Sequence, residues 1–223
     1  MQTKSETQSG SVIERVRRAL GRSGPLSAAP TPPKILEPVT RLVHSDIGLP
    51  ELFASRAATN KMHPEAVGAG EVAARVVAFL KSKGATRIAL PNSPVLERLG
   101  VLAALRGAGF EARTWDQMTL DELYDYDASV TDVLWAIAET GSLVIKSSAA
   151  HGRAISLVPI VHVAIVDAGN CVPDLLDLME ILGKEGVGNN VTIISGPSKT
   201  ADIEGALVTG VHGPGEVQVY ILQ

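Results

Sequence analysis

From about residue 46 onward, the hydrophobic positions switch between the spacing of helices and that of buried strands. Residues 71–83 place apolar side chains three and four apart and are followed by Gly84, which is typical of a helix and its C-terminal glycine. Further helices are expected over residues 94–107, 129–138 and 173–183. Runs rich in β-branched residues predict strands, at residues 86–90, 110–115, 142–146, 154–158, 161–167, 190–195 and 216–222.

This alternation predicts an α/β fold with a mainly parallel sheet flanked by helices. The close spacing of the strands within residues 142–167 predicts an added antiparallel element. Residues 11–20 have the pattern of a short amphipathic helix, and five prolines make residues 21–40 an extended linker. We therefore expect two parts, an N-terminal helix with a Pro-rich linker over residues 1–40 and an α/β domain over residues 41–223.

Composition narrows the class of protein. Hydrophobic residues make up 45% of the 223 residues, which is enough for a sizeable core, and the net charge of −4 argues against a nucleic-acid surface. The one cysteine, Cys171, excludes an internal disulfide, a redox pair and a cysteine-held iron–sulfur cluster. No apolar run is long enough to span a membrane and no secretory signal is visible, so a cytoplasmic location is expected.

Two patterns that could suggest a cofactor are interpreted as structural. Residues 68–73 have the glycine spacing of a dinucleotide fingerprint, but neither a preceding strand nor an acid after the next strand is apparent. The histidines form no local metal-binding pair, so no metal is expected. His162 lies in a β-branched run and is interpreted as a satisfied strand histidine, whereas His151 and His212 lie in predicted loops and are better functional candidates.

Residues 139–142 are open to two interpretations. Gly141 can simply end the helix expected before it. A carboxylate beside a hydroxyl where the chain enters the sheet can also act chemically, so Glu139 is a candidate general base or acyl-accepting nucleophile.

Residues 195–204 follow a predicted strand, at the end where open α/β sheets bind ligands. Gly196 and Pro197 make a turn, and Ser198 or Thr200 can cap a short helix after it. Free amides at that helix start, with the hydroxyls and Lys199 nearby, would suit a carboxylate or phosphate. The alternative is that the hydroxyls only satisfy backbone donors. A second glycine-rich turn covers residues 210–215.

Four blocks in this order, at residues 138–144, 153–159, 195–204 and 210–214, resemble the hallmark motifs of the LUD-domain family, and the resemblance covers roughly residues 46–223. It implies a fold like ribose-phosphate isomerase, glucosamine-phosphate deaminase and the CoA transferases. It also implies a role in oxidising L-lactate to pyruvate with iron–sulfur partner proteins. The chain resembles the short member of that system that lacks cluster-binding cysteines, so it is expected to carry no cofactor of its own.

The leading hypothesis is an accessory subunit of an iron–sulfur-dependent L-lactate oxidising complex that binds a small anionic ligand. The alternatives are an independent CoA-transferase-like or folate-ligase-like enzyme using Glu139, and a non-catalytic scaffold. Glu139 and His212 are the candidate catalytic residues. The candidate ligand-binding residues, expected in one crevice, are Thr140, Gly141, Ser142, Arg153, Ser195, Gly196, Ser198, Lys199, Thr200, Asp202 and Gly213.

Overall fold

The chain divides into two units, residues 1–40 and residues 41–223. The computed structural model describes residues 12–22, 31, 33, 34, 36, 40–43, 48–201 and 207–223. In the first unit, α1 (Val12–Ala19) is the predicted amphipathic helix, and most of the predicted linker lies outside the described residues. Within these described ranges, no helix combines the length and apolar character needed to cross a membrane.

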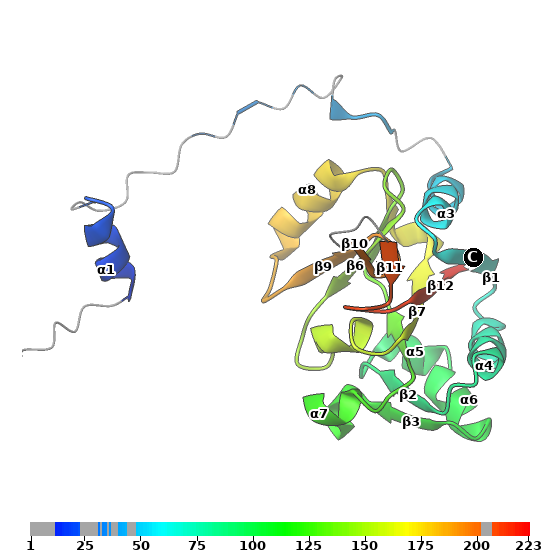
Figure 1. Ribbon diagram of the computed structural model, residues 1–223. Coiled ribbons are helices and arrows are strands. Elements are labelled where there is room, and N and C mark those ends of the chain that lie inside the picture. The colour runs from blue at the N-terminus through cyan, green and yellow to red at the C-terminus, as the bar shows by residue number, and fades with distance from the viewer. Residues whose placement is uncertain are drawn as a thin grey trace, which may run out of the picture. The chain divides into compact units, whose positions relative to one another are not determined.

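Six parallel strands form the central sheet of the second unit (Figure 1). From one edge to the other they are β1 (His63–Val67), β12 (Glu216–Leu222), β7 (Val161–Asp167), β4 (Ala128–Asp132), β2 (Arg87–Leu90) and β3 (Glu111–Thr114). Every neighbouring pair is parallel, which confirms the predicted fold class. The inner strands are buried on both faces, as expected of a parallel sheet that is covered on both sides.

Helices cover one face of this sheet. They are α4 (Val72–Ser82), α5 (Pro94–Arg98) and α6 (Val101–Gly107), and α4 and α6 place Leu80 and Leu105 against Val130 and Val163 of the sheet. Burying each such side chain stabilises the fold by about 1.5–3 kcal/mol. The helix expected over residues 94–107 is split in two because Gly100 adopts a left-handed conformation, with φ of 68°.

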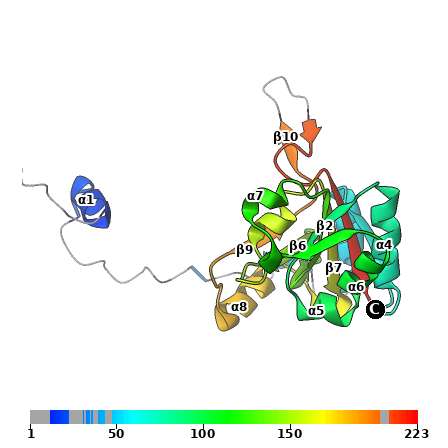
Figure 2. The same cartoon turned by 90° about the horizontal axis from the view of Figure 1, so that it is seen from below.

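The opposite face packs against α3 (Leu49–Thr59) and a second sheet. Phe53 of α3 and Leu143 of the second sheet lie in one cluster with Ala164 and Val219 of the central sheet. The second sheet has the order β8 (Cys171–Val172), β5 (Trp135–Ile137), β6 (Ser142–Lys146) and β9 (Val191–Ile194). Helix α8 (Leu175–Glu185) packs on it, and the β10 (Lys199–Ala201) and β11 (Leu207–Thr209) hairpin projects from the body (Figure 2). Short helices complete the unit, at η1 (Trp115–Gln117), α7 (Leu120–Leu123), η2 (Arg153–Ser156) and η3 (Ala168–Asn170).

Three local predictions are wrong. Residues 129–138 form β4 and β5 rather than a helix, because β4 fills the gap between β2 and β7 and the sheet overrides local propensity. Residues 154–158 are not a strand, and η2 is closed by the Ser156 hydroxyl donating to the Arg153 carbonyl at 3.1 Å. A helix does not begin directly after Ser198, because residues 199–201 pair with β11 instead, and residues 202–206 lie outside the described residues.

The sequence interpretation of residues 68–73 also changes. Strand β1 directly precedes Gly68, and it was missed because Pro64 interrupts its pattern. Proline is tolerated there because β1 is an edge strand that pairs only with β12 among the strands of its sheet. The second requirement of the fingerprint remains unmet, since Pro91 and Asn92 follow β2 where an acid is needed.

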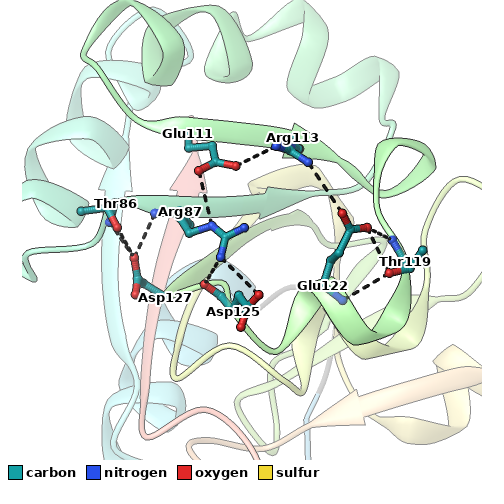
Figure 3. Close-up of polar contacts among 8 residues, drawn as sticks. All are labelled: Thr86, Arg87, Glu111, Arg113, Thr119, Glu122, Asp125 and Asp127. Atoms are coloured by element: carbon teal, nitrogen blue, oxygen red, sulfur yellow. Dashed lines mark hydrogen bonds and ion pairs between the residues drawn. The ribbon is translucent and has the colours of Figure 1, made fainter.

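A polar network ties together the amino-terminal ends of β2, β3 and β4 (Figure 3). One carboxylate oxygen of Asp127 accepts from the backbone N of Thr86, the Thr86 hydroxyl and the backbone N of Arg87, at 2.7, 2.8 and 2.9 Å. Burial alone would raise the pKa of Asp127, but these hydrogen bonds favour the carboxylate and the net pKa is lowered. The carboxylate therefore fixes the start of β2 against β4.

We expect Asp127→Asn to lower the free energy of unfolding by about 1–2 kcal/mol at pH 7, because three hydrogen bonds lose a charged acceptor. The loss should shrink as pH falls through about 4, where the unfolded carboxyl takes up its proton in the wild type. Asp125→Asn is the matched control, since the Asp125 carboxylate forms an exposed ion pair with Arg87 rather than bonds to backbone amides. Urea unfolding at both pH values measures the difference, and equal stabilities of the two variants at pH 7 would contradict this account.

Candidate functional site

Three hydroxyl side chains lie in contact where the turn after β5 meets the end of β9. Thr140 Oγ1 lies 2.7 Å from Ser142 Oγ, which lies 2.7 Å from Ser195 Oγ. Ser142 is 1% exposed, whereas Thr140 and Ser195 are open to solvent. Because β6 and β9 are antiparallel with Leu143 opposite Ile194, strand pairing itself brings Ser142 and Ser195 side by side.

Asn60, which follows α3, joins both turns. Its side-chain amide donates to the Thr140 carbonyl at 2.7 Å, and its own carbonyl accepts from the Lys199 ammonium at 3.3 Å. We call Asn60, Thr140, Ser142, Ser195 and Lys199 the hydroxyl site. Sequence reasoning missed Asn60 because it lies 80 residues before Thr140, and no local motif marks it.

Two of the predicted glycines make this convergence possible. Gly141 has φ of 63°, and a Cβ there would lie 2.5 Å from the carbonyl carbon of Arg56. Gly196 has φ of 113°, and a Cβ there would overlap the carbonyl oxygen of Asn60. Both the dihedral angle and the close approach of α3 therefore require glycine at these two turns.

The hydroxyl site can hold an anion. Each hydroxyl has one proton to donate, and the two contacts within the chain of three use two of the three protons. When Thr140 donates to Ser142 and Ser142 donates to Ser195, the remaining proton is on the exposed Ser195 hydroxyl. The Lys199 ammonium reaches the same turn, since it contacts the Asn60 carbonyl against which Gly196 packs. A hydroxyl donor and an ammonium at one turn are suited to a carboxylate or phosphate group.

The loop over residues 210–215 packs against the same turn. The backbone N of Ser198 donates to the Pro214 carbonyl at 2.8 Å, and a Cβ at Gly213 would lie 3.2 Å from the Ser198 Cβ. His212 is exposed in this loop. The structure thus brings Ser198 and Gly213 together beside the hydroxyl site, and His212 is next to them in sequence.

The other predicted site residues are less closely connected. Glu139 is half-buried, and its backbone N donates to the Pro173 carbonyl at 3.0 Å. Arg153 is exposed at the start of η2, and Thr200 lies within the β10–β11 hairpin. Among the described side chains, no hydrogen bond or ion pair connects Glu139, Arg153 or His212 to the hydroxyl site. Asp202 lies outside the described residues.

A buried polar cluster contains His162, Thr131 and His151, and the sequence predicted only the buried position of His162. His162 Nε2 lies 2.8 Å from Thr131 Oγ1, and its Nδ1 has no partner within the part of the chain that the structure describes. Burial, and then the neighbouring His151, lower the pKa of His162 to about 3. Burial also lowers the pKa of His151, although Asp132 opposes it. His162 is therefore a buried strand histidine as predicted, but only one of its two nitrogens is satisfied.

A sequence comparison covers both sheets and the hydroxyl site. The model of the LUD domain matches residues 50–222, which include both sheets and both turns of the hydroxyl site. The chain belongs to the LUD-domain family. This result confirms the resemblance found in the four sequence blocks.

Individual relatives extend this comparison. The chain is 32% identical over 141 residues to lactate utilization protein C of Bacillus subtilis, covering 57% of this chain and 58% of that protein. It is 30% identical over 144 residues to lactate utilization protein C of Halalkalibacterium halodurans, covering 60% and 62%. The matched region therefore spans about three fifths of the length of these relatives.

A solved structure supports the fold of the LUD domain. A DUF162 family protein from Deinococcus radiodurans superposes with a TM-score of 0.59 at 23% sequence identity. The match covers 78% of this chain and 96% of that one. At this level of identity the likeness concerns the fold alone.

Proposed function

We propose that this chain is an accessory subunit of a lactate-utilisation system and binds a small carboxylate at the hydroxyl site. The relatives named lactate utilization protein C support the biological role. The exposed Ser195 hydroxyl, in contact with buried Ser142 and at the turn that Lys199 reaches through Asn60, is the observation that carries the ligand class. L-Lactate and pyruvate both present the carboxylate that such a site would hold.

The ligand is held by directed hydrogen bonding and charge. Ser142 and Thr140 orient the Ser195 hydroxyl so that its proton faces the ligand, and Lys199 supplies the positive charge. Asn60 keeps Lys199 near the turn through its carbonyl oxygen. The β10–β11 pairing uses backbone groups after Ser198, so recognition rests on side chains and on the turn rather than on a helix start.

Electron transfer in this proposal belongs to iron–sulfur partner proteins. The chain has one cysteine, Cys171, and burial raises the pKa of its thiol to about 11, so it is a poor thiolate ligand. The contribution of this subunit is then to bind and present the substrate or product to its partners.

We expect Ser195→Ala to weaken carboxylate binding by about 10–100-fold, because it removes one hydrogen bond to a charged group. Calorimetric titration of the full chain with L-lactate and pyruvate measures this loss. Ser55→Ala, an exposed serine on α3, is the matched control and should bind like wild type.

Growth tests the biological role separately. In a strain that lacks this protein, wild type and Ser55→Ala should restore growth on L-lactate, and Ser195→Ala should do so poorly. Full growth with Ser195→Ala would overturn the role of the hydroxyl site, and failure of wild type to restore growth would overturn the lactate assignment.

A further inference from the structure

A cavity lies at the carboxyl ends of β2 and β3, and none of its lining residues belongs to the hydroxyl site. Its volume is about 330 Å³, within the range of small-molecule sites. Open α/β sheets bind ligands at this edge, where loops follow the parallel strands. Its polar lining residues are Asn92, Ser93, Glu97, Thr114, Asp116 and Gln117.

The charge of the lining selects against anions. Glu97 and Asp116 are acidic and exposed, and neither side-chain carboxylate makes a hydrogen bond or ion pair within the described ranges. None of the residues that line the cavity, all of them described, is lysine or arginine. A phosphate or carboxylate would therefore meet two carboxylates and no lysine or arginine in the lining, whereas hydroxyl groups could donate to the carboxylates.

The rest of the cavity lining combines an apolar surface with the polar amide of Asn92. Leu96, Leu102 and Ala103 give an apolar surface from α5 and α6, which suits a flat ring. Asn92 is exposed and its side chain is unpaired among the described residues, so its amide offers both a donor and an acceptor. A ligand that fits has a ring with polar edges on one side and free hydroxyls on the other.

Contacts within the chain hold the rim of the cavity in place without a ligand. The backbone N of Asn92 donates to the Ala150 carbonyl at 2.9 Å, which ties the exit of β2 to the loop over residues 148–152. Gly152 lies so close to the Trp115 ring that a Cβ would overlap it, which ties the exit of β3 to the same loop. These contacts lower the conformational entropy that the loops lose when a ligand binds.

We propose that this cavity binds a neutral ribonucleoside. The base would lie on the apolar surface of α5 and α6 with its edge toward Asn92. The ribose 2′- and 3′-hydroxyls would donate to the carboxylate of Asp116, as hydroxyl pairs of sugars donate to acids at strand ends in other α/β folds.

Calorimetric titration of the full chain with adenosine tests this proposal. Adenosine should bind saturably, and 2′,3′-dideoxyadenosine should bind about tenfold more weakly because it lacks both donors. Asp116→Asn should reduce that preference, and Asp121→Asn, an exposed acid on α7, is the matched control. Ala103→Phe should abolish binding by filling the cavity from an exposed helix position.

Several results would overturn the proposal. Absence of saturable adenosine binding would rule out the ligand class, and equal binding of the dideoxy compound would rule out the contact of the diol with Asp116. Unchanged affinity in Ala103→Phe would place any nucleoside elsewhere. Ser195→Ala should leave adenosine binding intact, so this result is independent of the hydroxyl site.

Discussion

Replacing Gly141 by alanine should lower the free energy of unfolding by more than about 3 kcal/mol. The new Cβ would meet backbone atoms of α3 at Arg56 and Ala57, which cannot turn away as a side chain can. The residue must also keep φ of 63°, where a side chain adds strain. Relief requires α3 to move away from the turn, and this would separate Asn60 from Thr140.

Urea unfolding measures this effect, and Gly183→Ala is the matched control. Gly183 lies in α8 with open space around its Cβ position and without a positive φ, so alanine there should be neutral or stabilising by up to about 1 kcal/mol. A Gly141→Ala protein within about 1 kcal/mol of wild type would show that α3 does not pack on this turn as described.

Stability should fall steeply as pH drops from about 6.5 toward 4, because His162 is buried in its neutral form. The pKa of His162 is about 3 in the folded protein, so below pH 6.5 only the unfolded chain takes up this proton. Each such histidine contributes up to about 1.4 kcal/mol per pH unit. His151 acts in the same direction, since its pKa is also lowered.

His162→Gln should lower by about one the number of protons that the chain takes up on unfolding, and so flatten the fall of the unfolding free energy with pH. The reason is that the amide can still bond to Thr131 and does not titrate. His212→Gln makes the same exchange in an exposed loop and is the matched control. The window above pH 4.5 separates the histidines from carboxylates such as Asp127, which take up protons at lower pH. Unfolding free energies that stay constant from pH 7 to 5 would contradict a neutral buried His162.

Four strands of the central sheet, β2, β3, β7 and β12, were predicted from sequence. The β-branched runs of β7 and β12 are almost wholly buried, and this pattern leaves few other structures possible. Residues 129–138 were not predicted as strands, since alanine, leucine and tryptophan there also suit a helix. The segment forms a strand because β4 lies between β2 and β7, and this position is a property of the whole sheet. Strand β1 was missed for a related reason, as Pro64 is compatible with a strand only at an edge.

The hydroxyl site was predictable in part. Glycines beside serines at the ends of expected strands pointed to Ser142 and Ser195, and strand pairing brings these two together. Sequence could not indicate Asn60, whose role depends on how α3 packs against the two turns. The helix start expected directly after Ser198 was wrong because residues 199–201 find a pairing partner later in the chain.

Binding of a small carboxylate at the hydroxyl site is the central claim, and a two-dimensional amide NMR titration with pyruvate tests it most directly. The largest shifts should occur at the backbone amides of Gly141, Ser142, Ser195, Gly196 and Lys199, and they should disappear in Ser195→Ala. Shifts that are absent, or that concentrate at the carboxyl ends of β2 and β3 instead, would contradict the claim.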